Sequence, residues 1–516
     1  MDRFARHLVY KIGRYSILIG AGLTSATALA QNAPVATPPA APAAGTPGAP
    51  APDQTAQPGD DAATRPPNAE PPWQDRQDRI DEIDQRTRVL ERQLKLAREA
   101  AAAAAAVPLP QPSAIVQADD NGFSISSPDR LYQIRFKGQL QFDGRRFFTS
   151  DPVLQSSDTF LLRRIRPTFD GTLLGLVDFR ITPDFGNNTT AIYDAYIDAH
   201  PRPWLRLRAG KFKGPLGLER LQADQDLTFI ERGLDSNLTS QREIGLELWG
   251  DVASGLLRYE AGVFNGNADN TLTDVDSDHA KTFAGRIFVQ PFDADALSFL
   301  GRLGLGLAAS TGNEKGVATL TAPNPWMGTF KSDGQQSIGS YLTSTIDIMQ
   351  TVVAYGRHTR INPQLYYYNG PVGLLAEWVK EYQQVAELTT TGTPFGTGAY
   401  NNTAGHVTVS GALGGDVTYE GIKPHKPLDL AAGTFGALEL AFRYDWLNVD
   451  SAAFPTGIDP TKSVRQARAH GVAVNWQLSR NVKVDGDYEQ TSFTGGAKTG
   501  NRPTEKVLLG RFQIAF

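Results

Sequence analysis

Apolar and polar residues alternate along most of the chain, from about Asn121 to Phe516. Because successive side chains of a β-strand point to opposite faces, this period of two predicts strands with one apolar and one polar face. The clearest segment has Ile134, Phe136, Leu140 and Phe142 on one face. Its other face carries Arg135, Lys137, Gln139, Gln141 and Asp143. Similar segments begin near Val177, Leu205, Ile244, Leu438 and Val482.

The alternating segments are too long and too charged for an ordinary soluble sheet. They run to about ten residues, which is the length that a tilted strand needs to cross a bilayer. Lipid cannot satisfy backbone N–H and C=O groups, so a sheet that crosses it must close into a barrel. The pattern predicts an all-β, transmembrane antiparallel β-barrel over residues 121–516, with about sixteen strands and an aqueous lumen. The strands should start near residues 131, 160, 176, 191, 204, 242, 255, 281, 299, 360, 373, 405, 436, 468, 482 and 507.

A different period precedes the barrel, from Trp73 to about Ala106. Spacings of three and four residues predict a helix with an a/d seam. The seam consists of Ile80, Ile83, Thr87, Leu90, Leu94, Ala97, Ala101 and Ala104. A short periplasmic coiled coil and a solitary solvated helix both fit, and we favour the coiled coil because an isolated helix needs support.

The N-terminus has the composition of an export signal. Arg3, Arg6, Lys11 and Arg14 precede an apolar stretch, and Ala28-Leu29-Ala30 has the form of a cleavage site, which predicts a signal peptide over residues 1–30. Residues 31–72 are rich in Ala and Pro and predict a disordered tether, and residues 107–120 predict a linker. No apolar stretch long enough for a membrane helix follows the signal, so we expect the barrel in the outer membrane of a Gram-negative cell.

The composition excludes several other classes of protein. The chain has no cysteine, which excludes disulfides and thiolate metal sites. A net charge of −5 argues against a nucleic-acid binder. The seven histidines are dispersed, and there is no HExxH, GxSxG or P-loop motif, so we predict no enzyme, metal or cofactor. The glycines of residues 301–306 fit barrel curvature or close packing better than a nucleotide loop. A barrel enzyme and a tether that joins the outer membrane to the cell wall remain alternatives to a channel.

Several stretches resemble the phosphate- and polyphosphate-selective porin family. They are LLRRIRPTFD at residues 161–170, GKFKGPLGLER at 210–220, LTFIER at 227–232 and GALELAFRYD at 436–445. The resemblance covers about residues 120–516. It implies a trimer of sixteen-stranded passive channels whose third loop, here about residues 214–240, folds into the lumen as a constriction.

The resemblance also implies an anion pathway. Its cations match Arg163, Arg164, Arg220 and Arg232, and its acidic member matches Asp194. Alternation alone adds Arg135, Lys137, Arg166, Arg206 and Arg208 to the lining. Guanidinium groups can replace part of the hydration shell of a passing anion. For each of these arginines, a structural ion pair with a neighbouring carboxylate is the alternative.

The sequence departs from the family at the positions that would select phosphate. Gln139 stands where the family has an arginine, and the third loop carries Asp224 and Asp226 in place of small hydroxyl residues and a lysine. Only Lys315 and Lys331 supply positive charge between Arg302 and Arg357. Permeant small anions, with phosphate among them, and a wider range of small solutes are therefore both consistent with the sequence. The C-terminal Phe516, which follows alternating apolar residues, resembles the signal read by the barrel-assembly machinery.

Overall fold

The computed structural model describes residues 74–106, 114–149, 157–272, 274, 276, 279–292, 300, 302–317, 324–344, 346–454 and 456–516. The predicted signal peptide and tether lie outside these residues. The described part forms two units, a helix and a barrel, which belong to residues 1–107 and 108–516 respectively.

The helix α2 spans Gln74–Ala106. Its apolar residues Ile80, Ile83, Leu90 and Leu94 are 53–63 % exposed. Ion pairs of 2.7 Å join Glu82 to Arg86 and Asp84 to Arg88 along the helix surface. None of the helices that the structure describes is both long and apolar enough to cross a membrane.

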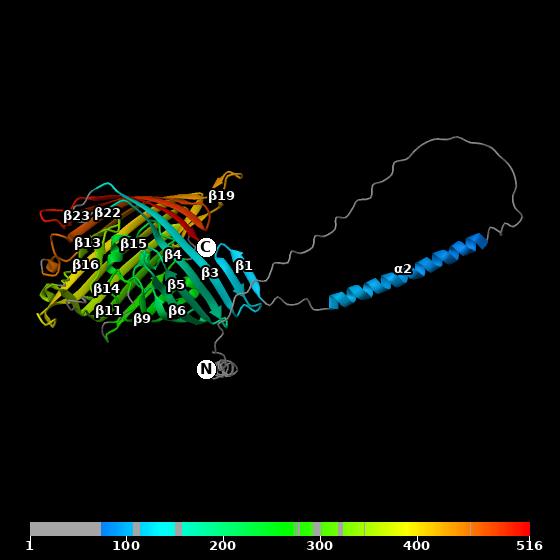
Figure 1. Ribbon diagram of the computed structural model, residues 1–516, viewed down its shortest axis with the longest axis horizontal. Coiled ribbons are helices and arrows are strands. Elements are labelled where there is room, and N and C mark those ends of the chain that lie inside the picture. Colours follow the sequence, from blue (N-terminus) through cyan, green and yellow to red (C-terminus); the bar gives the residue numbers. More distant parts are fainter. Residues whose placement is uncertain are drawn as a thin grey trace, which may run out of the picture. The chain divides into compact units, whose positions relative to one another are not determined.

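The barrel is a closed ring of sixteen antiparallel strands, which confirms the predicted fold class (Figure 1). Each strand pairs with the next, and β24 pairs back onto β3 from Val507↔Phe147 to Ala515↔Gln139. The ring strands are β3 (Gln133–Phe147), β4 (Thr159–Leu173), β5 (Val177–Asp184), β6 (Ala191–Arg202), β7 (Leu205–Phe212), β8 (Glu243–Val252), β9 (Leu257–Phe264), β10 (Thr282–Val289), β11 (Leu303–Lys315), β14 (Val352–Asn369), β15 (Val372–Leu388), β16 (Pro394–Leu413), β21 (Ala437–Asn448), β22 (Val464–Gln477), β23 (Val482–Gly495) and β24 (Glu505–Ala515).

The predicted linker over residues 107–120 is wrong at its C-terminal end. Residues Ile115–Asp119 form strand β1, which pairs with β2 (Gly122–Ser126) in a hairpin that continues onto the start of β3. The alternation did not reveal this hairpin because each of its strands, on either side of the turn at Asp120 and Asn121, is only five residues long. The other described segments outside the ring are α3 (Leu218–Leu221), η1 (Leu234–Leu238), η2 (Ala253–Gly255), β12 (Thr329–Lys331), β13 (Ser337–Ser340), η3 (Ile348–Gln350), β17 (Gly415–Thr418), β18 (Gly421–Pro424), β19 (Leu428–Asp429), β20 (Thr434–Phe435) and η4 (Ser451–Ala453).

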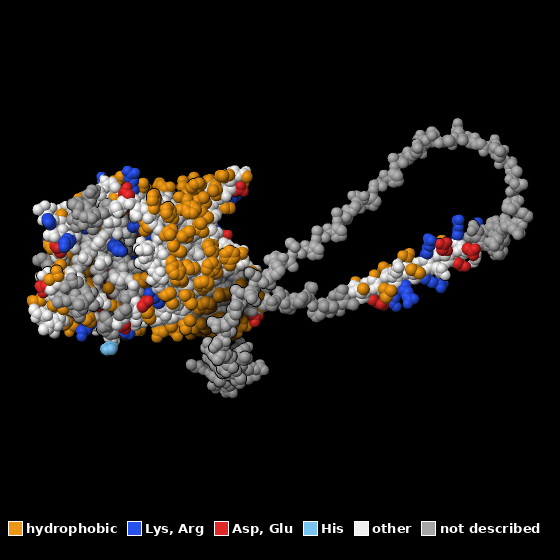
Figure 2. Space-filling view, viewed as in Figure 1, with side chains coloured by type: hydrophobic (Ala, Val, Ile, Leu, Met, Phe, Trp, Pro, Cys, Tyr) orange, Lys and Arg blue, Asp and Glu red, His pale blue; other side chains and the backbone are white. Residues whose placement is uncertain are grey.

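The two faces of each strand separate as the alternation predicts. On β3, Leu140 and Phe142 are 41 % and 44 % exposed on the outer surface, whereas Gln141 and Asp143 are fully buried inside. Figure 2 shows hydrophobic side chains gathered in a broad band on the outside of the barrel. This band is the surface that lipid covers.

The chain end and two glycines show how closely the wall packs. Phe516 pairs with Gly138 through two backbone hydrogen bonds of 2.9 and 3.0 Å, and a Cβ on Gly138 would lie 2.6 Å from the Phe516 ring. Gly304 and Gly306 of β11 leave room for the Phe288 ring, which supports the close-packing interpretation of residues 301–306. Recognition of Phe516 by the assembly machinery stays a prediction.

The ends of the barrel differ in the length of their connections. Short turns, such as residues 174–176 and 203–204, join strands at one end, which we call the turn end. Long loops, such as residues 213–242, 265–281 and 316–351, join them at the other, the loop end. Strands β14 and β16 start at Val352 and Pro394, earlier than the predicted residues 360 and 405. In β14 the alternation is hidden by the three successive apolar residues Val352–Ala354 and by the register shift that follows Ala354, and in β16 by the Gly- and Thr-containing start of the strand.

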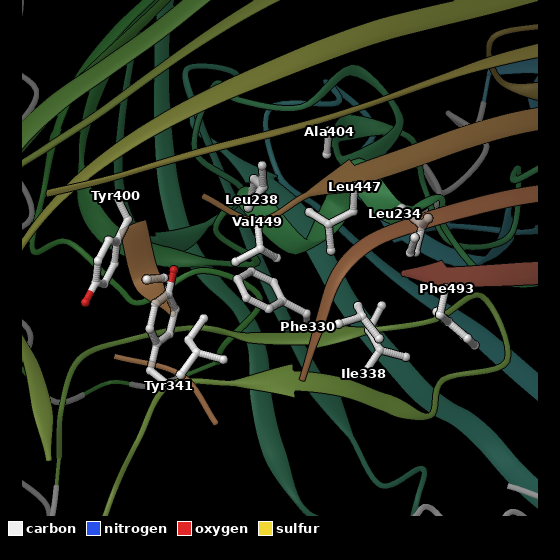
Figure 3. Close-up of a cluster of buried hydrophobic side chains, with 14 of the residues drawn as sticks. Leu234, Leu238, Phe330, Ile338, Tyr341, Tyr400, Ala404, Leu447, Val449 and Phe493 are labelled. Carbon is white, nitrogen blue, oxygen red and sulfur yellow. The ribbon is translucent and has the colours of Figure 1, made fainter. Parts of the chain in front are cut away.

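An apolar core fills part of the interior at the loop end (Figure 3). Leu234 and Leu238 from the loop 213–242 and Phe330 and Ile338 from the loop 316–351 pack together on the inner wall. The wall contributes Tyr400, Ala404, Leu447, Val449 and Phe493. The two loops therefore fold inward because burying these side chains removes apolar surface from water.

Candidate functional site

The loop 213–242 between β7 and β8, which we call the constriction loop, crosses the inside of the barrel. Its short helix α3 starts at Leu218, and the backbone N–H groups of Leu218 and Glu219 both donate to the Glu377 carboxylate of β15 at 2.7 Å. A carboxylate at a helix N-terminus satisfies N–H groups that have no partner within the helix. Four strands further along the ring, Asp487 of β23 accepts a hydrogen bond from Ile230 N at 2.5 Å. These contacts fix the loop across the lumen.

Arg163 and Arg164 are neighbours on β4, yet both reach the constriction loop. Adjacent strand residues normally point to opposite faces. Here the pairing of β3 with β4 skips Arg163, because Gln141 faces Arg164 and Phe142 faces Leu162. This β-bulge turns both guanidinium groups inward. Arg163 binds Glu231 in a bidentate pair of 2.6 and 3.0 Å, and Arg164 lies 3.9 Å from the same carboxylate.

A second loop carboxylate, Asp224, collects more of the predicted cations. Arg166 and Arg232 both donate to it, and Arg164 Nη2 lies 3.6 Å from Asp224 Oδ1. Burial alone would raise the pKa of Asp224, but the three arginines hold that pKa well below its ordinary value. For Arg163, Arg164, Arg166 and Arg232, the structure thus shows the ion pairing that was the alternative to a free anion ring.

Tyr193 separates this cluster from the predicted acidic member of the pathway. Its ring lies between the guanidinium groups of Arg166 and Arg242, which are 3.6 and 3.7 Å from the ring centroid. Arg242 in turn pairs with Asp194 at 3.2 Å. Asp194 therefore holds Arg242 in place against Tyr193.

Arg220 differs from the other loop arginines. It donates to Thr239 Oγ1 at 3.2 Å and to the carbonyl of Ser236 at 2.5 Å, and none of its hydrogen-bond partners among the described residues is a carboxylate. Lys213 likewise donates to two carbonyl oxygens, of Leu221 and Gln222, at 3.3 and 2.6 Å. Both cations help to brace the loop from within.

A cavity of about 1800 Å³ extends from the constriction loop to the turn end of the barrel. The hairpin of β17 and β18 projects toward it, and the Tyr419 hydroxyl donates to the carbonyl of Leu218 at 2.6 Å. Asp226 lines the cavity, whereas Glu231 does not. Burial, together with Glu420, raises the pKa of Asp226 to about 7, although Lys483 acts in the opposite direction.

Cations outnumber carboxylates in one cluster on the inside of the barrel, of which Lys137 and Arg180 line this cavity. Arg135, Lys137 and Arg180 all contact a single carboxylate, Asp170, at 2.8, 3.0 and 3.1 Å. Their side chains are 38 %, 29 % and 38 % exposed, whereas that of Asp170 is 5 % exposed. This group, which we call the basic wall, therefore presents excess positive charge to the water of the lumen.

Arg206 and Arg208, which were also predicted to line the lumen, form ion pairs that join neighbouring strands of the barrel wall. Arg206 and Arg208 pair with Asp198 at 3.2 and 2.8 Å, and Arg206 also pairs with Asp178. Arg208 lines the cavity as alternation predicts, but both arginines form the ion pairs between strands that were the alternative to an anion-binding role. Gln139 lies on the cavity wall, opposite Arg166 in the strand register.

Sequence reasoning missed several partners that define the site. Glu231 directly precedes Arg232 in the LTFIER stretch, so the sequence itself marks it as a neighbour of a predicted site residue. Asp170 ends the LLRRIRPTFD stretch and lies on the inner face by alternation. Their contacts with cations 68 and 35 residues away along the chain could not be predicted without the fold.

The chain is similar to several known proteins. The curated relative Porin O of Pseudomonas aeruginosa is 23 % identical over 412 residues, which cover 72 % of this chain and 86 % of the relative. The solved outer membrane channel DcaP of Acinetobacter baumannii is 10 % identical, with a TM-score of 0.44 over 76 % of this chain and 99 % of that one. An anion-selective porin from Comamonas acidovorans is 11 % identical, with a TM-score of 0.43 over 75 % of this chain and 100 % of that one.

The family described as phosphate-selective porin O and P matches residues 134–516. The match starts at the second residue of β3 and runs to the C-terminal Phe516, so it includes all strands of the ring. The chain is an outer-membrane porin and belongs to the phosphate-selective porin O and P family.

Proposed function

We propose that this porin is a passive channel, assembled as a homotrimer, that favours small anions without holding phosphate in a tight site. The observation that carries the anion preference is the basic wall, where three partly exposed cations share the one carboxylate of Asp170. Excess positive charge in a confined aqueous space raises the local concentration of anions. The anion-selective relative from Comamonas acidovorans is consistent with this direction.

The constriction loop argues against strong phosphate binding. A phosphate would need the guanidinium forks of Arg163, Arg164, Arg166 and Arg232, and these already bind Glu231 and Asp224. Displacing a buried carboxylate from its guanidinium partner costs more than the new contact gains. Several weak contacts in sequence allow flux, whereas one tight site would slow it.

The first prediction concerns the basic wall. Replacing Lys137 and Arg180 together by Gln removes two positive charges that line the cavity. At roughly 0.5 kcal/mol for each exposed charge, the anion-to-cation permeability ratio should fall about fivefold. The measurement is the reversal potential of planar bilayers in a KCl gradient. Lys462→Gln, at a 75 % exposed lysine of the loop end, is the control that should leave the potential unchanged. An unchanged potential in the double variant would contradict the proposal.

The second prediction concerns phosphate. In the natural chain we expect phosphate to inhibit the chloride current with an apparent Kd above about 1 mM. Asp224→Asn frees the forks of Arg166 and Arg232, and should tighten the inhibition about tenfold, the effect of one charge-assisted hydrogen bond. Asp226→Asn, two residues away and outside this ion-pair cluster, is the matched control. Micromolar inhibition of the natural channel would show that a tight phosphate site exists.

The third prediction concerns pH. Because the pKa of Asp226 is raised to about 7, its carboxyl group is mostly charged at pH 8 and mostly neutral at pH 6. Lowering the pH should therefore increase the anion-to-cation permeability ratio about two- to threefold, the effect of one charge. Burial lowers the pKa of Lys213 well below its ordinary value, so its titration acts in the same direction. Asp226→Asn should remove most of the pH dependence. If the permeability ratio changed equally with pH in the natural protein and in this variant, another titratable group would be responsible.

We also propose that three copies of α2 form a parallel coiled coil. With Ile80 and Ile83 at positions a and d, Arg79 and Arg86 fall at g, and Asp84 and Glu91 fall at the e positions that follow. In a parallel arrangement each g residue faces the next e residue of its neighbour, so both pairs attract. An antiparallel arrangement would bring like charges together.

The fourth prediction uses the absence of cysteine from the chain. In the full-length protein, Leu90→Cys should form disulfide-linked dimers under mild oxidation, because equal d positions meet only in a parallel, in-register coiled coil. Arg92→Cys, at the outer f position, should remain monomeric on a denaturing, non-reducing gel. Equal cross-linking of both variants, or of neither, would contradict the coiled coil.

A further inference from the structure

A second polar cluster lies at the loop end of the barrel, apart from the cavity. Asp269, from the loop 265–281, contacts His358 and Arg360 of β14 and lies beside Glu381 of β15. All four residues are at most 6 % exposed, and none of them lines the cavity within the described part of the chain. The cluster is therefore separate from the basic wall to which the anion preference is assigned above.

Three atoms of this cluster face one another. His358 Nε2 lies 2.9 Å from Glu381 Oε1 and 3.8 Å from Asp269 Oδ2, and all three atoms lie within 4.8 Å of each other. Ligand atoms bound at about 2.0–2.2 Å to a tetrahedral zinc ion are roughly 3.3–3.6 Å apart. The observed spacings lie on both sides of this value, so small side-chain movements would create the coordination geometry.

The opposite atom of each of these side chains is held by another residue. Glu314 Oε1 lies 2.8 Å from His358 Nδ1. Arg360 Nη2 donates to Asp269 Oδ1 at 2.6 Å, and Asn402 Nδ2 donates to Glu381 Oε2 at 2.7 Å. Metal-binding histidines typically donate their second N–H to a carboxylate, and ligating carboxylates are hydrogen-bonded in the same way. The outer contacts therefore orient three donor atoms toward one point.

The cluster also has unsatisfied negative charge. Asp269 Oδ2 has no hydrogen-bond partner although Asp269 is only 4 % exposed, and Glu314 Oε2 likewise has none. Three carboxylates, of Asp269, Glu314 and Glu381, face one guanidinium group and one imidazole. These charges leave one negative charge in excess when His358 is protonated and two when its imidazole is neutral, and a buried excess charge is unfavourable. A divalent cation would neutralise it.

We propose that Asp269, His358 and Glu381 bind a divalent transition-metal ion of the zinc class. Imidazole together with carboxylate suits zinc, whereas calcium and magnesium prefer oxygen ligands alone. The bound ion would tie the loop 265–281 to β14 and β15 at the loop end of the lumen. The dispersed histidines gave no sign of such a site, because its ligands lie on three separate segments of the chain.

The cluster of Glu219, Asp235 and His406 is less suited to a metal. Its three donor atoms are also close together and buried. However, Arg443 Nη1 lies 3.6 Å from Glu219 Oε1, and the Gly233 N–H donates to Glu219 Oε2 at 2.9 Å. Both oxygens of Glu219 therefore already face a positive group or a donor.

The fifth prediction tests the proposed site in the full-length protein, purified in detergent without a histidine tag. After treatment with a chelator and addition of Zn²⁺, the natural chain should retain about one ion per protomer, measured by elemental analysis after gel filtration. Asp269→Asn and Glu381→Gln should lose it. Glu314→Gln, which changes only the outer contact, should keep the site but weaken zinc affinity about 10- to 100-fold.

Three controls keep the result specific. Asp276→Asn removes another carboxylate of the same loop, one that pairs with Lys281 at 2.6 Å, and should retain the ion. Co²⁺ in place of Zn²⁺ should give visible absorption bands that His358→Gln abolishes, and His406→Gln should leave them unchanged. Fewer than about 0.1 ions per protomer in the natural chain, or equal binding in Asp269→Asn, would overturn the proposal. The cluster would then be a hydrogen-bonded ion-pair network around a protonated His358.

Discussion

The structure depends on one constraint: a strand inside hydrocarbon must pair its backbone N–H and C=O groups with other strands. A closed ring meets this constraint because it has no edge, and β24 completes it by pairing with β3. Closure then separates two environments along every strand. Residues such as Phe142 face lipid, while the adjacent Asp143 faces an enclosed interior. All the polar chemistry of this porin follows from that enclosure.

Enclosure brings charges close together without bulk water to screen them. At the constriction loop most cations are paired: Asp224 and Glu231 bind three of the four arginines that the family resemblance assigns to anion binding, all except Arg220, and also Arg166. At the basic wall the pairing is incomplete, because Asp170 serves three cations. In the function proposed above, the loop therefore sets the shape of the pathway, while the basic wall would supply the field that distinguishes anions from cations.

The sequence predicts what depends on neighbours in the chain and fails where distant segments meet. Alternation located the ring strands and their inner faces, and the predicted starts differ most from the observed ones at β14 and β16. It could not show that a bulge at Arg163 turns two adjacent arginines to the same side. Nor could it show that Glu231 lies beside Arg163, because this contact depends on how a long loop folds inward.

The same limit explains why a metal site could escape notice in a chain with dispersed histidines. Motif spacing detects ligands that share one helix or one turn, but a barrel brings ligands together through the register of neighbouring strands. In the wall, His358 and Glu381 are adjacent because β14 pairs with β15, and Asp269 reaches them because its loop folds inward. In such a fold, whether a buried histidine can bind a metal depends on the contact made by the ring nitrogen that does not bind it. When that nitrogen meets a carboxylate, as His358 meets Glu314, the other nitrogen is oriented for a ligand.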